Sequence, residues 1–118
     1  MKIELAEDPV RVQGPDVEFT LADDGGAHVF IILSVDGVDA FEHAESNQGS
    51  KSRVFQLEIG KTYTAGVFIS AHAHQALNRK YDTEVSANGQ PIAWAEGAIP
   101  KDQMSDREFK SFEITVVV

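Results

Sequence analysis

The amino-acid sequence predicts an all-β protein, an antiparallel β-sandwich of about nine short strands, with a small β-barrel or a jelly roll as the alternative. Two observations support this prediction. Apolar and polar residues alternate in several short stretches, which is typical of half-buried strands, and turn-forming pairs fall between these stretches. The length of 118 residues suits one domain spanning residues 1–118.

The predicted strands follow one another along the whole chain. The stretch HVFIIL is apolar throughout, so we expect it to be a central strand, and the others alternate or nearly alternate. The remaining stretches are VEFTL (17–21), RVFQLEI (53–59), TYTAGVFIS (62–70), YDTEVSA (81–87), QPIAWAE (90–96) and SFEITVVV (111–118). About nine strands at this spacing favour a sandwich or a barrel.

Two tight turns are predicted from glycine-containing pairs. Asp36-Gly37 and Asn88-Gly89 each suit the positive-φ positions of a type I′ hairpin turn. For the second hairpin we expect Val85 to pair with Ile92 and Thr83 with Trp94 on the opposite strand.

Pro91 in this hairpin predicts that residues 90–96 form an edge strand. Proline cannot donate a backbone hydrogen bond, so it is tolerated where no further strand pairs on that side. An edge strand can accept a strand from another chain. We therefore expect a protein partner, or a second copy of the chain, to dock on residues 90–96.

Two polar segments interrupt the pattern. Residues 44–52, AESNQGSKS, are small and polar, and we expect a loop there. Ser105 lies three residues before Glu108, which is the spacing of a helix capping box. Two interpretations of this second segment stay open: one helical turn, or an irregular polar loop before the last strand.

Composition and charge exclude several classes of function. Ten basic against nineteen acidic residues give a net charge of −9, which repels phosphate backbones and anionic lipids. We expect no nucleic-acid partner and no membrane association. The absence of cysteine excludes disulfides and thiolate metal sites. A signal peptide needs an uninterrupted apolar core, but glutamates interrupt the stretch MKIELAEDPV. No export signal is therefore visible, and a cytoplasmic location is favoured.

The stretch FQLEIGKTYTAGVFI (55–69) carries the most specific local pattern. Leu57, Gly60 and Tyr63, followed by alternating apolar residues, resemble the tyrosine corner of fibronectin type III and immunoglobulin-like sandwiches. The resemblance implies an immunoglobulin-like sandwich in which the tyrosine hydroxyl bonds back to the preceding backbone. In those domains one more strand follows the strand that begins at this corner, whereas here the residues beyond that strand suffice for three.

The histidines of AHAHQ (71–75) are the main candidates for chemistry. If alternation continues from Tyr63, then Ala71 and Ala73 face the core while His72 and His74 point outward. Were the following strand an antiparallel neighbour, its outward Asp82 and Glu84 would lie beside both imidazoles. Two imidazoles and a carboxylate suit zinc or iron. His28 has no second histidine at such a spacing, and we expect it in a loop or on the surface.

A second resemblance concerns the same histidines. Gly66, five residues, then His72-Ala73-His74 is similar to the start of the cupin signature, which would imply a metal site. The chain has Asn78 and Arg79 where a cupin places its ligand glutamate, and it lacks the second cupin motif.

Taken together, the sequence predicts a non-catalytic binding or assembly module, and we expect neither an enzyme nor a cofactor. A structural subunit of a larger complex is equally compatible with a small, acidic, cysteine-free sandwich. The alternative is a small cupin-like metal-binding protein or metalloenzyme that uses the His72 and His74 face. The candidate binding residues are His72, His74, Asp82 and Glu84.

Overall fold

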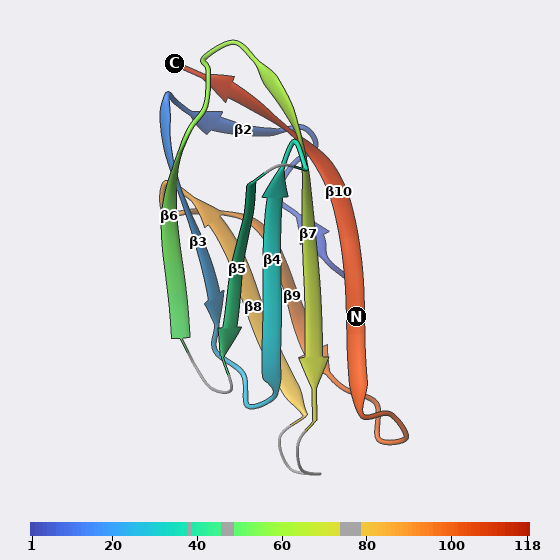
Figure 1. Ribbon diagram of the computed structural model, residues 1–118. Helices are drawn as coiled ribbons and strands as arrows, with labels where there is room; N and C mark the ends of the chain where they lie inside the picture. Colours follow the sequence, from blue (N-terminus) through green and yellow to red (C-terminus); the bar gives the residue numbers. More distant parts are fainter. Residues whose placement is uncertain (38, 46–48, 74–78) are drawn as a thin grey trace.

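Two five-stranded sheets pack face to face and confirm the predicted all-β sandwich (Figure 1). A computed structural model describes residues 1–37, 39–45, 49–73 and 79–118, and for residues 39–45 it describes the backbone alone. Sheet A has the strand order β1-β9-β8-β3-β6, and sheet B has the order β2-β10-β7-β4-β5. The described residues contain no helix long and apolar enough to cross a membrane.

The described residues form ten strands, one more than the nine or so expected. The first has two residues and the last has thirteen. Three strands follow β7, as the remaining chain length predicted. In chain order the strands are β1 Glu4–Leu5, β2 Val10–Gln13, β3 Asp16–Asp23, β4 His28–Val35, β5 Asp39–Glu45, β6 Gly49–Gln56, β7 Thr62–His72, β8 Lys80–Ala87, β9 Gln90–Ala98 and β10 Ser105–Val117.

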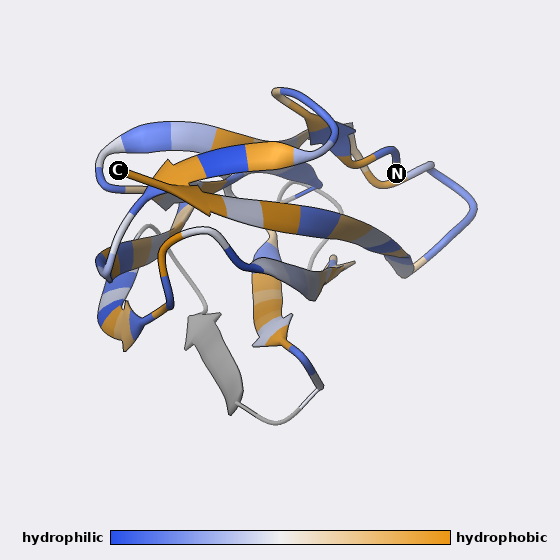
Figure 2. Ribbon diagram, turned by 90° about the horizontal axis from the view of Figure 1, so that it is seen from above, coloured by the Kyte–Doolittle hydropathy of each residue, from blue (hydrophilic) through white to orange (hydrophobic). Residues whose placement is uncertain are grey.

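The core lies between the sheets and follows from strand alternation. In β4 every second residue, from Val29 to Val35, is buried, and in β7 the residues on the face of Tyr63 are buried through Ala71. Alternating bands of opposite hydropathy along the strands are visible in Figure 2. The largest fully buried side chains include Phe19, Leu21, Ile31, Leu33, Ile69 and Ile114. Burial of these apolar groups is the main favourable contribution to folding.

Both predicted tight turns have positive φ values at the expected residues. Asp36 and Gly37 have φ values of 56° and 67°, and Asn88 and Gly89 have values of 52° and 81°, which is the left-handed region that a type I′ turn requires. The register predicted beyond the second turn is wrong. Ala87 does pair with Gln90 and Ser86 with Pro91, but a bulge then shifts the pairing.

Because of this bulge, Val85 pairs with Ala93 and Thr83 with Ala95, one residue further than expected. A bulge inserts an extra residue into one strand and bends it. Trp94 consequently pairs with Glu84 on the outer face of sheet A.

The free edge predicted at residues 90–96 is also wrong. Strand β1 pairs with β9, with Glu4 opposite Trp94 and Leu5 opposite Ala93. The amide of Ala6 further donates to the carbonyl of Ile92 at 3.0 Å. The chain thus covers the middle of this edge with its own first strand. The sandwich is not purely antiparallel either, because β2 pairs in parallel with β10.

Both polar segments contribute more strand than expected. Of the loop predicted at 44–52, residues up to Glu45 belong to β5 and residues from Gly49 belong to β6, while 46–48 lie outside the described residues. Neither interpretation of Ser105 and Glu108 holds. Strand β10 begins at Ser105, which pairs with His72, and the Glu108 carboxylate accepts a hydrogen bond from the amide of Ile3.

The hydrogen bond expected from the tyrosine corner is present. The Glu58 amide donates to the Tyr63 hydroxyl at 2.8 Å. The Tyr63 side chain is buried, and the Lys61 ammonium lies 4.8 Å from the centre of its ring. These contacts hold the connection between β6 in sheet A and β7 in sheet B.

Replacing Tyr63 with Phe should lower the free energy of unfolding by about 1 to 3 kcal/mol, because the partly buried Glu58 amide loses its acceptor. Urea denaturation measures this change. Hydrogen exchange at the Glu58 amide should accelerate in the same variant. Unchanged stability together with unchanged exchange would show that the hydroxyl is not a structural partner.

Candidate binding surfaces

The His72 side chain is exposed on the outer face of sheet B, as alternation predicted, whereas Ala71 and Ala73 are buried. The expected carboxylate neighbours are absent from this location. Strand β7 pairs with β4 and β10, not with β8. On the β4 side the residue opposite His72 is His28, which no sequence pattern connected with it.

The surroundings of His72 give it a local partner. Its Nε2 atom lies 3.0 Å from the hydroxyl of Ser70. Ser70 is itself buried, although alternation placed it on the solvated face. His74 lies outside the described residues. Among the residues that are described, no group of three or more histidine, aspartate or glutamate side chains could hold a metal ion.

Asp82 and Glu84 are on the other sheet, so the predicted union of these carboxylates with His72 is wrong. Strand β8 crosses to sheet A, where it pairs with β3 and β9. Asp82 lies directly opposite Glu96, and Glu84 lies opposite Trp94. These side chains line a cavity of about 280 Å³. The predicted carboxylates therefore lie near Trp94 instead of His72.

Carboxylates dominate the outer face of sheet A. Cross-strand pairing places Glu4 beside Trp94, and Glu18 follows further along β3. The acidic residues at outward positions of this sheet are Glu4, Asp16, Glu18, Asp82, Glu84 and Glu96. Such a surface attracts cations and repels anionic partners.

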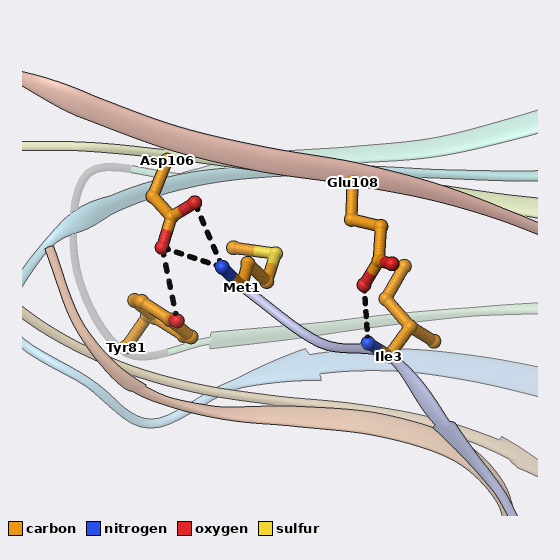
Figure 3. A network of polar contacts seen from close by, with 5 residues as sticks. All are labelled: Met1, Ile3, Tyr81, Asp106 and Glu108. Carbon is orange, nitrogen blue, oxygen red and sulfur yellow. Dashed lines mark hydrogen bonds and ion pairs between the residues drawn. The ribbon is translucent and has the colours of Figure 1, made fainter.

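A polar network joins the two sheets at the start of the chain (Figure 3). Both carboxylate oxygens of Asp106 accept hydrogen bonds from the Met1 α-ammonium, each at 2.9 Å. The Tyr81 hydroxyl donates to Asp106 Oδ2 at 3.2 Å. Burial, reinforced by the negative charge of Asp106, raises the pKa of Tyr81 to about 12. The network connects β8 of sheet A to β10 of sheet B.

The outer face of sheet B differs sharply from that of sheet A. Strands β4, β7 and β10 are in register there, so their outward side chains form rows across the sheet. One row, which we call the apolar row, consists of Ile32, Phe68 and Phe109. The next row, the small row, consists of Ser34, Gly66 and Ser111.

Phe109 is the most exposed member of the apolar row, at 60%. Its ring lies over Gly66. A Cβ atom at position 66 would be 2.8 Å from two carbons of that ring, so the absence of a side chain lets the ring lie close to the strand. Phe30, Ile32 and Phe68 are half-buried on the same face. Contiguous apolar residues on an exposed face typically mark an interaction site.

The rows beyond this apolar centre are mostly polar. On one side Arg107 and Ser70 share a row with Phe30, and the His28 and His72 pair with Ser105 forms the next row. On the other side are Glu113 with Thr64, and then Thr115 with Thr62. Arg107 and Glu113 thus flank the apolar and small rows at opposite ends.

Sequence patterns did not identify this surface. The sequence did not distinguish the outward positions of β4, because VFIIL (29–33) is apolar at every position. Two signals were available: Phe68, which alternation from Tyr63 places on the outward face, and Phe109, an aromatic residue in a polar segment. Comparison with protein-family models, with curated proteins and with solved structures found no match to this chain.

The raised pKa of Tyr81 predicts a loss of stability in alkaline solution. Below pH 10 the phenol keeps its proton in the folded and unfolded states alike, so Tyr81 contributes no pH dependence there. Between pH 10 and about 12 the unfolded chain loses this proton more readily, so the free energy of unfolding should fall as pH rises. Tyr81→Phe should show a shallower fall in urea denaturation from about pH 9 to 11.5. Parallel curves for the two proteins would contradict this assignment.

The direct opposition of Asp82 and Glu96 predicts a stabilising substitution. Like charges facing each other across strands are unfavourable by about 0.2 to 1 kcal/mol. Asp82→Asn should therefore raise the free energy of unfolding by about that amount. Asp16→Asn, which removes the same charge opposite Gln56, is the matched control and should have a smaller effect. An equal gain in both variants would mean that overall charge, not this pair, is responsible.

Proposed function

We propose that this β-sandwich is a non-catalytic binding and assembly module that docks on a flat, apolar protein surface through the outer face of sheet B. The observation that carries the proposal is the apolar row in the middle of three paired strands, in which Ile32 and Phe68 are half-buried and Phe109 is exposed. Protein interfaces combine an apolar, aromatic-rich centre with a polar rim. The rows that contain Arg107 and Glu113 supply such a rim.

The tyrosine corner supports a relation to immunoglobulin-like sandwiches, because the hydrogen bond from Glu58 to Tyr63 is the contact that this resemblance implies. A shared fold does not determine a function. The proposal therefore depends on the surface of sheet B and not on the resemblance.

A photoreactive amino acid placed at position 109 tests this function in living cells of the source organism. Irradiation should attach a protein to position 109, and the same group at position 84, on the acidic face, should attach none. Both positions are on exposed strand surfaces. No protein adduct at position 109, adducts of lipid or nucleic acid alone, or equal protein adducts at both positions would each overturn the proposal.

A further inference from the structure

Resting on the proposed function, we infer that the occupant of the sheet B face is a second copy of this chain, bound in a two-fold symmetric dimer. Self-complementarity of the face is the basis for this inference. In a symmetric dimer one patch contacts itself, so a feature on one side of the axis must fit the feature on the other.

The two-fold axis that fits lies between sheet B of one copy and sheet B of the other. It is parallel to both of these sheets and perpendicular to their strands. Rotation about this axis places each strand over its own counterpart and reverses its direction. Packed sheets keep their strands within about 30° of one another, so this arrangement is an ordinary one. On β10 the axis passes at residue 110, midway between Phe109 and Ser111.

This axis brings rows of different size together. The apolar row and the small row lie one residue to either side of it, and the register of β4, β7 and β10 keeps both rows aligned. The apolar row of each copy therefore faces the small row of the other, with Ile32 opposite Ser34 and Phe109 opposite Ser111. Because each Phe109 ring lies over Gly66 of its own chain, Phe68 of one copy faces the Phe109 ring of the other at that position.

The same axis matches the charges. Arg107 and Glu113 are each three residues from position 110, on opposite sides, and both point outward from β10. Arg107 of each copy thus faces Glu113 of the other, which gives two equivalent ion pairs at the rim. Within one chain these residues are six positions apart on an extended strand, about 20 Å, too far to pair.

The acidic surfaces do not oppose this arrangement. The carboxylates of sheet A lie on the far side of each sandwich. With sheets about 10 Å apart, the two acidic faces of the dimer are roughly 30 Å apart, several times the screening length of about 8 Å at physiological salt.

The size of the face predicts a weak dimer. Three strands about 4.8 Å apart and about ten residues long cover on the order of 500 Å² in each copy. The total is at the lower limit of specific interfaces. We therefore expect a dissociation constant of about 10 to 100 μM, within the range that analytical ultracentrifugation measures.

The test exchanges the rim charges. In purified protein, Arg107→Glu alone and Glu113→Arg alone should each weaken the dimer by about tenfold or more, because both contacts become repulsive. Mixing the two single variants should restore association, since each chain then offers the charge that the other lacks. The double variant carrying both changes should also dimerise. Phe109→Ser should abolish the dimer.

Lys80→Glu and Glu84→Arg alter the net charge equally but lie on sheet A, so dimerisation should not change by more than about twofold. A protein that stays monomeric to about 500 μM, or single variants that mixing does not rescue, would overturn the second copy as occupant. If position 109 still attaches a different protein in cells, the proposed function stands. If it attaches none, both fail.

Discussion

The alignment of β4, β7 and β10 is the constraint on which both surfaces of sheet B depend. Side chains in strands alternate strictly, so a slip of one residue would exchange the buried and exposed sets. The register that buries Ile31, Ile69 and Phe112 is the same register that aligns Ile32, Phe68 and Phe109 on the outside. The apolar face is therefore fixed by the core. A change in the register of these strands would move the outer apolar side chains and would also remove the buried ones from the core.

Strand β10 connects this constraint to the rest of the molecule. Its carboxyl half pairs with β7 on one side and with β2 on the other. Its amino half also pairs with β7, and it carries Asp106 and Glu108, which bind the backbone nitrogen atoms of Met1 and Ile3. Where the strand no longer contributes apolar side chains to the core, ionic and hydrogen-bonded contacts therefore join the sheets. Tyr81 extends that link from β8 to Asp106.

The sequence predicted which way side chains point much better than which strands are neighbours. Alternation correctly placed Ala71 and Ala73 inside and His72 outside, and the turn residues marked both tight hairpins. Periodicity carries no information about pairing between distant segments. The chain crosses to sheet A after β7, so Asp82 and Glu84 meet Trp94, while His28, far away in sequence, meets His72. The bulge after the turn at Asn88 likewise depends on packing that no local pattern reveals.

The two outer faces divide the chemistry of the molecule, and this division determines where association is favourable. A net charge of −9 resists self-association in general, because like-charged surfaces repel. Repulsion is strongest between faces that carry the carboxylates, and on sheet A these include the directly opposed Asp82 and Glu96. Sheet B presents Arg107 and Glu113, opposite in sign, around an apolar centre. The acidic composition that predicts no nucleic-acid partner thus leaves, on strands β4, β7 and β10, a surface where the proposed apolar contact meets little electrostatic resistance.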